Sequence, residues 1–288
     1  MSQTNLDAIA NQPWLDEVGK PLSEATRALF RNAGPAGRSL KDALHGVWLG
    51  HPLHPVLTDV PIGAWTTALA LDAQEAATGD EGYGRAADVA VALGLVSAVG
   101  AAITGLNDWS ETDGEARRVG LLHGLMNLSA TTLIATSYAL RRNGSRTAGR
   151  MWTVAGYGIA VAAAYLGGSL VYRERIGVTH AVVDAPEDFT SVMDSSALPD
   201  NSMRKATIGE SSFLLVRQGG RVCALAHSCA HLGGPLSEGT LEDGTVTCPW
   251  HGSTFDITDG HVVHGPAAQP QPCFAVRERD GRIEVKGA

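Results

Sequence analysis

Cys229-Ala-His231 and Cys248-Pro-Trp-His251 are two matched Cys/His pairs with sixteen residues between them. Thiolates are soft ligands that suit iron bound to sulfide, and neutral imidazoles suit a second iron without adding charge. Mixed Cys/His sets also bind zinc, but zinc patterns usually build each pair from one residue type. The mixed pairs therefore predict a 2Fe-2S cluster, with zinc as the alternative.

The segment from Val182 to Ala288 resembles a Rieske domain, over a little more than a third of the chain. The resemblance implies that Cys229 and Cys248 bind one iron and that His231 and His251 bind the other. The residues that follow each pair also fit loops that wrap a cluster: Leu232-Gly233-Gly234-Pro235-Leu236 and Gly252-Ser253-Thr254-Phe255.

The resemblance allows a comparison with high-potential Rieske proteins. The residues around the four ligands differ from those of these members. In those members a cysteine in each loop forms a disulfide, whereas the matching residues here are Gly234 and Trp250. Their Ser and Tyr hydroxyls donate to the cluster sulfurs; Ser253 matches the Ser, but Phe255 replaces the Tyr and cannot donate. Fewer such hydrogen bonds make reduction harder, so we expect a potential in the lower half of the window of about −150 to +300 mV.

The rest of this segment has the pattern of short strands and tight turns. Gln218-Gly219-Gly220 and Asp280-Gly281 each lie between two strand-like runs, which is typical of β-hairpins. We expect small antiparallel sheets with both ligand loops at one tip.

Other cysteines and histidines of the segment are interpreted without a ligand role. Cys223 and Cys273 lie on predicted strands and are expected to be small buried hydrophobes, with a disulfide or redox role as the alternative. His227, His261 and His264 are expected to be ordinary surface or loop residues.

Upstream, three runs contain no Asp, Glu, Lys or Arg, and each is long enough to cross a bilayer as a helix: Val89–Asn107, Val119–Leu140 and Met151–Tyr172. A fourth apolar stretch, residues 55–74, is interrupted by Asp59 and Asp72. The fold class is therefore expected to be a multidomain membrane protein, an all-α four-helix transmembrane bundle followed by an all-β domain. A buried soluble bundle is the alternative.

Small residues recur at steps of four in two of these spans, which predicts close helix packing. The members are Gly94, Ala98 and Ala102 in one span and Gly156, Ala160, Ala164 and Gly168 in another. In the remaining uncharged span His123, Asn127 and Thr131 share one face, which we expect to point into the bundle.

Residues 45–63, which include His51-Pro and His54-Pro, resemble a family of uncharacterised four-span bacterial membrane domains, the DUF2231-like proteins. The resemblance covers roughly residues 40 to 175 and implies architecture more than activity. From the residues themselves, His51 or His54 together with His123 could ligate haem b or bind a quinone, and Asp59 could carry a proton. The alternative is that these residues only shape and pack the helices.

The predicted domain borders are residues 1–50 for an amphipathic N-terminal segment, 51–175 for the bundle and 182–288 for the Rieske domain. Two amphipathic helices are expected in the first segment, on the membrane surface or on the Rieske domain. No signal peptide is expected, because the first thirty residues lack a basic start followed by an apolar run.

Four spans would place both termini on the same side of the bacterial cytoplasmic membrane. Basic residues near the spans number six on the terminal side and five on the other, which decides little. The absent disulfide and export signal favour a cytoplasmic Rieske domain.

The charge of the chain bears on its partners. The net charge of −8 argues against nucleic acid, which needs a basic surface. From residue 181 onward the chain carries 14 acidic and 8 basic residues, which favours a redox partner with a basic docking face. Membrane lipid is the other expected partner.

Three functions remain at this point. The first is a membrane-anchored one-electron carrier, with haem b or quinone as its partner in the bundle. An electron carrier or oxidoreductase subunit is expected rather than a self-sufficient enzyme. The second is the electron-supplying component of a Rieske-type oxygenase system; an oxygenase would itself need a mononuclear iron held by two His and a carboxylate in a separate domain. The third is a redox sensor or a cluster that stabilises the fold.

Overall fold

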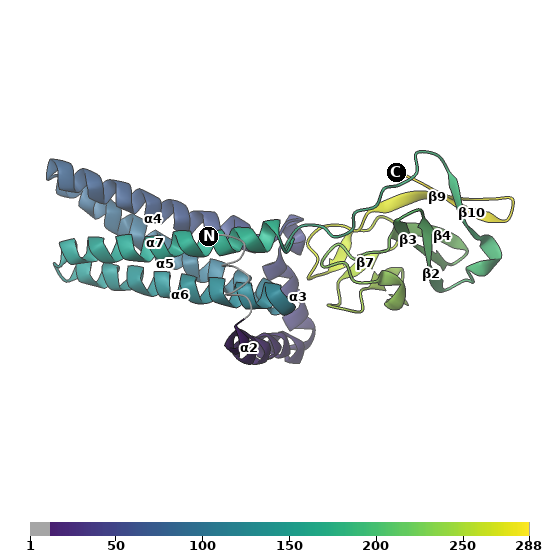
Figure 1. Ribbon diagram of the computed structural model, residues 1–288, viewed down its shortest axis with the longest axis horizontal. Helices are drawn as coiled ribbons and strands as arrows, with labels where there is room; N and C mark the ends of the chain where they lie inside the picture. Colours follow the sequence, from purple (N-terminus) through teal and green to yellow (C-terminus); the bar gives the residue numbers. More distant parts are fainter. Residues whose placement is uncertain (1–11, 288) are drawn as a thin grey trace. The chain divides into compact units, whose positions relative to one another are not determined.

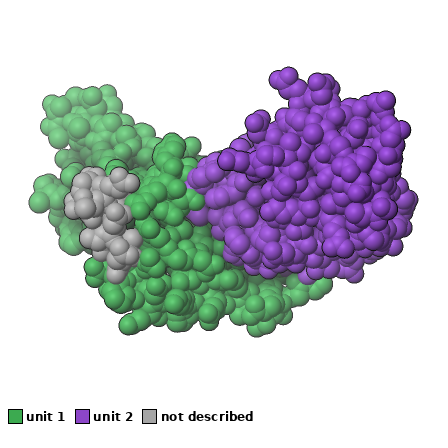
Figure 2. All heavy atoms as spheres, turned by 45° about the vertical axis from the view of Figure 1, so that its right-hand side comes forward, with its two compact units in different colours: residues 1–37, 53–174 green, residues 38–52, 175–288 purple. Residues whose placement is uncertain are grey.

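The computed structural model describes residues 12–287, which divide into two compact units. Unit 1 contains the chain up to residue 37 and residues 53–174, and unit 2 contains residues 38–52 and 175–288 (Figure 2). Long helices build unit 1, and every strand of the described chain lies in unit 2. The prediction of a helical region followed by an all-β domain is therefore confirmed.

Four long helices of unit 1 lie side by side (Figure 1): α4 (Leu53–Thr78), α5 (Glu81–Ser110), α6 (Gly114–Arg142) and α7 (Arg146–Tyr172). Three of them, α5, α6 and α7, are long and apolar enough to cross a membrane, and they contain the three uncharged runs. The less apolar α4 carries Asp59 and Asp72 and does not meet this criterion. A total of four spans therefore stays a prediction.

Glycines allow the helices of the bundle to approach closely. A Cβ atom on Gly94 would lie 2.2 Å from Trp65 Nε1, and one on Gly156 would lie 2.7 Å from Ile134 Cγ1. The predicted ridges at steps of four are only partly right, because Ala102 and Ala164 are exposed. An α-helix has 3.6 residues per turn, so positions four apart drift around the helix and leave the buried face.

Charged side chains join all four long helices at the end of the bundle that lies near the α4–α5 connection. Arg141 on α6 is fully buried and donates to both carboxylate oxygens of Asp72 on α4, and to Asp88 on α5 at 3.2 Å. Arg146 on α7 binds Glu75 at 2.6 Å and Asp88 at 3.0 Å. Pairing removes most of the cost of burying the two acids of α4.

We expect Arg141→Met to lower the melting temperature of the full chain in detergent, because it leaves Asp72 buried without its main partner. Breaking a buried pair costs about 3 kcal/mol or more. The double variant Asp72→Leu/Arg141→Met should recover part of the loss, whereas Arg85→Ala, whose side chain is 75% exposed, should change nothing. An unchanged melting temperature for the single variant would show that Arg146 and Arg150 suffice.

Unit 2 contains two antiparallel sheets. The six-stranded sheet has the order β1 (Thr190–Asp194), β10 (Arg282–Lys286), β9 (Cys273–Arg279), β4 (Arg221–Ala226), β3 (Ser211–Gln218) and β2 (Ser202–Ile208). The four-stranded sheet has the order β5 (Thr240–Glu242), β6 (Thr245–Thr247), β7 (Thr254–Asp256) and β8 (Val262–His264).

Both predicted hairpins are present. Strands β3 and β4 pair through the turn at Gly219 and Gly220, and β9 and β10 pair through Asp280 and Gly281. All four turn residues have positive φ angles between 51° and 77°, which glycine adopts without steric cost. Inward side chains of both hairpins, including Phe213, pack in a fully buried core.

Helices also form at the two predicted amphipathic segments, as α2 (Pro13–Asn32) and α3 (Gly34–His45). The first belongs to unit 1, and α3 continues from unit 1 into unit 2 at residue 38. Short 3-10 turns complete the described elements: η1 (Val47–Leu49), η2 (Ser195–Ala197) and η3 (Leu236–Glu238).

Candidate metal centre

Two loops with the same backbone pattern carry the two Cys/His pairs. In loop 1 (residues 227–235), the Cys229 amide donates to Gly234 O and the Cys229 carbonyl accepts from Gly233 N, both at 2.8 Å. In loop 2 (residues 248–253), the Cys248 amide donates to Ser253 O at 2.8 Å and its carbonyl accepts from Gly252 N at 3.1 Å. Each loop is thus a closed turn around its cysteine.

A left-handed glycine makes each turn possible. Gly233 and Gly252 lie four residues after their cysteines and have φ angles of 79° and 77°. A side chain is strained in this backbone conformation, so glycine is the residue that fits. The glycines that sequence analysis assigned to loops around a cluster have here a specific backbone role.

The two loops bring all four candidate ligands together. Cys229 and Cys248 are buried, and their sulfurs lie within hydrogen-bond distance of each other. The ring centroids of His231 and His251 are 5.0 Å apart, with the planes at 85°. Two soft thiolates and two imidazoles within this space match the donor set that a 2Fe-2S cluster requires.

Electrostatics distinguish the four groups. The contact with Cys248 and burial raise the pKa of Cys229, and the same hydrogen bond, donated by Cys229, lowers the pKa of Cys248. Burial holds the pKa of His231 well below its usual value, so that this ring is neutral. Its Nδ1 is buried and has no hydrogen-bond partner among the described residues. A buried ring nitrogen without a hydrogen-bond partner needs an explanation, and metal ligation supplies one.

Backbone amides support the sulfurs. The His231 amide donates to the Cys229 sulfur, and the amides of Trp250 and His251 donate to the Cys248 sulfur. The Ser253 hydroxyl also lies in hydrogen-bond contact with Cys229. Donors of this kind stabilise negative charge on sulfur and thereby tune a bound cluster.

Known proteins that resemble the chain agree with this geometry. Residues 188–275 match the profile of the Rieske 2Fe-2S domain, and residues 50–180 match that of DUF2231, a predicted membrane protein. Over 89 residues the chain is 34% identical to the 3-phenylpropionate/cinnamic acid dioxygenase ferredoxin subunit of Photorhabdus laumondii, with 31% of this chain and 84% of that protein covered. The chain belongs to the Rieske 2Fe-2S family. It joins a Rieske domain to a DUF2231 membrane domain, and the Rieske domain implies a 2Fe-2S cluster.

Other relatives also match only part of this chain. Human apoptosis-inducing factor 3 is 32% identical over 118 residues, which cover 40% of this chain but only 19% of that protein. A solved complex of reduced oxygenase and oxidized ferredoxin in carbazole 1,9a-dioxygenase contains a chain that is 28% identical, with a TM-score of 0.33 and with 34% of this chain and 93% of that chain covered.

Gly234 and Trp250 occupy the positions of the disulfide cysteines of high-potential Rieske proteins, and they differ in environment. Gly234 is buried, and a Cβ atom on it would lie 2.7 Å from Cys248 Sγ. Trp250 is 58% exposed, with its ring 6.4 Å from that of His251. Phe255, in contrast, is fully buried in the core. Loop 2 thus presents an exposed aromatic ring beside one candidate ligand.

Gln271 is a supporting residue that sequence analysis missed. Its side chain is buried and makes two hydrogen bonds with loop 1 and one with the end of β4: Oε1 accepts from Ala230 N at 2.8 Å, and Nε2 donates to Ser228 O and Ala226 O, both at 2.7 Å. It therefore fixes the backbone on both sides of Cys229. No local pattern reveals this role, because the partners lie more than forty residues away.

A segment outside the matched Rieske residues also contacts this domain. Asp42 on α3 accepts hydrogen bonds from His264 Nδ1 and Gly265 N, both at 2.8 Å. His45 is buried beside Gly265 and close enough to His231 to lower its pKa further. The expectation that His264 is an ordinary surface or loop residue is only partly right, because its side chain is 37% exposed but lies on β8 and bonds Asp42.

The remaining histidine and cysteine predictions have mixed outcomes. His227 lies in a loop, one of the two settings expected for it, but it is buried and bonds Ser237 Oγ at 2.8 Å, so it is not a surface residue. Cys223 and Cys273 lie on β4 and β9 as free cysteines, and burial raises the pKa of both, that of Cys273 to about 11. Both thiols are therefore protonated and unreactive at neutral pH.

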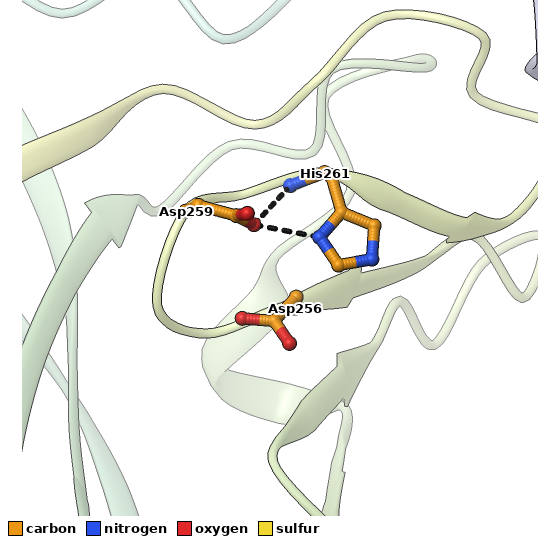
Figure 3. Close-up of side chains that lie close together, drawn as sticks. All are labelled: Asp256, Asp259 and His261. Carbon is orange, nitrogen blue, oxygen red and sulfur yellow. Dashed lines mark hydrogen bonds and ion pairs between the residues drawn. The ribbon is translucent and has the colours of Figure 1, made fainter.

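A second group of ionisable side chains lies in the turn between β7 and β8 (Figure 3). The ligand atoms of Asp256, Asp259 and His261 lie within 4.8 Å of one another. Asp259 accepts from the amide and Nδ1 of His261 at 3.0 and 2.7 Å, and Asp256 accepts from Thr258 N at 2.7 Å. These bonds are those of the turn itself, so the group has a sufficient structural explanation.

In the bundle, the structure places two of the four candidate haem or quinone residues together. The rings of His54 on α4 and His123 on α6 have centroids 6.4 Å apart. Asp59 is exposed on α4, one turn further along. His51 is exposed and belongs to unit 2.

We expect Gln271→Leu to destabilise the Rieske domain without changing its packed volume much. Three backbone groups, two in loop 1 and one at the end of β4, would lose this partner, and each buried unsatisfied group costs about 1–3 kcal/mol. The full chain should lose the visible absorption of its cluster at a lower temperature. Gln218→Ala, at the half-exposed end of β3, is the control. Equal stability of both variants would refute the supporting role of Gln271.

A second variant addresses the sulfurs. Ser253→Ala should lower the reduction potential of the cluster, because it removes a hydrogen bond to the Cys229 sulfur. A redox titration followed by electron paramagnetic resonance measures the shift. Ser237→Ala removes a hydroxyl that bonds His227 instead and should leave the potential unchanged. A potential that does not fall in Ser253→Ala would contradict the assigned contact.

Proposed function

We propose that the chain is a membrane-anchored one-electron carrier whose 2Fe-2S cluster is bound by Cys229 and Cys248 on one iron and by His231 and His251 on the other. The observation that carries the proposal is the meeting of two thiols and two imidazoles on two equivalent turns. The Nδ1 atom of His231, which is buried and has no hydrogen-bond partner among the described residues, supports it further. When bound, the cluster accepts and releases one electron.

The protein residues set the conditions for this exchange. Burial of both cysteines excludes water from the sulfurs, and the amides of loops 1 and 2 donate to them. His251 lies on the same loop as exposed Trp250. A short path from the cluster to the surface therefore runs through loop 2, where a partner can approach. The acidic balance of the residues after 181 suits a partner with a basic face.

We further propose that α4 crosses the membrane as a fourth span. It has 26 residues, enough for a hydrocarbon core about 30 Å thick. Its buried acid Asp72 is paired with Arg141, which removes the main obstacle to a lipid environment. Four spans put the Rieske domain and the N-terminal helices on one side, and a pair of Gly234 and Trp250 in place of a disulfide suits the reducing cytoplasm.

A second candidate function is electron supply to a Rieske-type oxygenase. It rests on the similarity to a dioxygenase ferredoxin subunit, of which the matched region covers 84%. On this reading, the DUF2231 domain only retains the ferredoxin at the membrane. A redox cofactor in the bundle, haem b or quinone, would favour the first function over the second, because a bundle that serves only as an anchor needs no cofactor. Of the residues first considered for it, His54 and His123 remain the strongest, since Asp59 is exposed.

The test is electron paramagnetic resonance of membranes from cells that produce the full chain. We expect a Rieske signal after reduction that stays with the membranes after washing with alkaline carbonate. Cys248→Ala should abolish this signal and leave the protein in the same fraction, whereas Cys273→Ala, which changes a thiol outside the four ligands, should retain it. A signal found only in the soluble fraction would refute membrane anchoring. Persistence of the signal in Cys248→Ala would refute the ligand assignment.

A further inference from the structure

The bundle consists of two helical hairpins that repeat one another. The pattern Gly94-x3-Ala98-Val99-x-Ala101-Ala102-x2-Gly105 on α5 recurs on α7 as Gly156-x3-Ala160-Val161-x-Ala163-Ala164-x2-Gly167. These positions are separated by a constant 62 residues. On α4 and α6 the corresponding separation is 69 residues, and it relates His54 to His123, Thr67 to Thr136 and Leu71 to Leu140.

Burial follows the same two separations. Trp65, Ala68 and Asp72 are buried on α4, and their equivalents on α6 are buried too: Ile134, Ser137 and Arg141. The buried positions Ala87, Val91, Gly94, Ala101 and Thr104 of α5 correspond to the buried positions Gly149, Thr153, Gly156, Ala163 and Leu166 of α7. Equivalent residues therefore face equivalent surroundings.

The close contacts repeat as well. The missing side chain of Gly94 leaves room for Trp65 in the first hairpin, and that of Gly156 leaves room for Ile134 in the second. Both contacts join a first helix to a second helix at equivalent positions. The α4–α5 and α6–α7 hairpins thus have the same internal packing, which is the signature of an internal duplication.

The two histidines are held in the same way. His54 Nδ1 lies 2.9 Å from Ala101 O, and His123 Nδ1 lies 2.8 Å from Ala163 O. Each ring also lies against a glycine one turn further along: a Cβ on Gly105 would be 2.7 Å from His54 Cε1, and one on Gly167 would be 3.0 Å from His123 Cε1. In both cases Nδ1 is the second nearest atom to the added Cβ and Nε2 is the third. The two rings therefore have equivalent orientations relative to their glycines.

Equivalent residues of the two hairpins meet twice. His54 faces His123 with centroids 6.4 Å apart, and eighteen residues further along the helices Asp72 pairs with its equivalent Arg141. Two equivalent residues can touch only near the axis that relates the repeats. The pair of imidazoles therefore lies on the approximate two-fold axis of the bundle, where a single ligand would meet both in the same way.

Hydrogen bonding fixes the chemistry of each ring. A neutral imidazole that donates from Nδ1 to a carbonyl has its lone pair on Nε2, and this is the form in which histidine binds metals. Asn127 Nδ2 lies 3.4 and 3.2 Å from the two ring nitrogens of His123. The Asn127 amide is therefore in contact with the same Nε2 whose lone pair a metal would take.

The separation of the rings fits a shared metal. Two imidazoles that bind opposite sides of one metal ion through bonds of about 2.0–2.1 Å place their centroids roughly 6 Å apart. Stacked or T-shaped rings in direct contact span a range from about 4.5 to 7 Å, so distance alone does not decide. The tautomer, the glycine behind each ring and the position on the axis add three independent features that direct packing does not require.

We propose that His54 Nε2 and His123 Nε2 are the two axial ligands of one metal centre on the axis of the DUF2231 bundle. Its chemistry is that of a metal which takes two opposed imidazoles, supplied either by haem iron or by a single transition-metal ion. The site joins the two hairpins, so a bound metal would link the halves of the bundle. It goes beyond the proposed electron carrier, because the Rieske cluster does not depend on it.

The experiment uses the full chain purified in detergent, and its probes are hemin and the chlorides of Cu²⁺, Ni²⁺ and Zn²⁺, each added alone and followed by desalting. Absorption spectra and metal analysis measure what is retained. Wild type is compared with His54→Ala, His123→Ala and the matched control His51→Ala. The Rieske resonance of each sample reports separately whether the chain is intact.

We expect wild type and His51→Ala to retain one equivalent of a single probe. If that probe is hemin, the spectrum should be low-spin, and each of His54→Ala and His123→Ala should convert it to high-spin or lose it. If the probe is an ion, each variant should lose most of it, because the two ligands act on one site. Imidazole added to either alanine variant should restore binding if the ring acts as a ligand.

Two results would overturn the proposal. One is retention of no probe by wild type while its Rieske resonance is intact, which would make the histidine pair a packing feature. The other is retention in both His54→Ala and His123→Ala at the wild-type level. Absence of the Rieske resonance from wild type would count against the proposed electron carrier. Retention of a probe by the bundle would still decide the metal site, because the two sites are independent.

Discussion

The approach of two sulfur atoms and two imidazole rings is the constraint on which the Rieske domain depends. Cys229 and Cys248 are buried in contact with each other, beside the two imidazole rings. Left-handed Gly233 and Gly252 close both turns, and the amide of Gln271 braces one of them from another part of the chain. Much of the domain therefore acts to hold four donors in one place, as expected where a cofactor completes the fold.

The bundle must accommodate charged and polar side chains among apolar helices. Its helices carry few charges, and those of α4 near the connection to α5 are paired with arginines of α6 and α7. Small residues at repeated positions bring the helices of each hairpin close together. Duplication of one hairpin explains why polar side chains occur on the axis at two levels, as an imidazole pair and as an ion pair. An anchor alone would require neither pair.

Local patterns predicted much of this architecture. The Cys/His spacing predicted the ligand loops, the Gly-containing turns predicted the two hairpins, and uncharged runs predicted α5, α6 and α7, because each of these signals lies within a few neighbouring residues. Contacts across long stretches were missed, such as those of Gln271 with loop 1 and of Asp42 with His264. Burial of His227 depends on how the sheet folds over it. The hairpin repeat was present in the sequence, but its separation changes from 69 to 62 residues, which hides it from a search at one fixed period.

Pulsed electron paramagnetic resonance on the reduced full chain, with histidine labelled by ¹⁵N, tests the central claim most directly. Two nitrogens strongly coupled to the unpaired electron are predicted, together with iron and acid-labile sulfide in equal amounts, and replacement of His231 or His251 should abolish this two-nitrogen signal. A chain that contains zinc and no labile sulfide, or a cluster without coupled histidine nitrogen, would contradict the account.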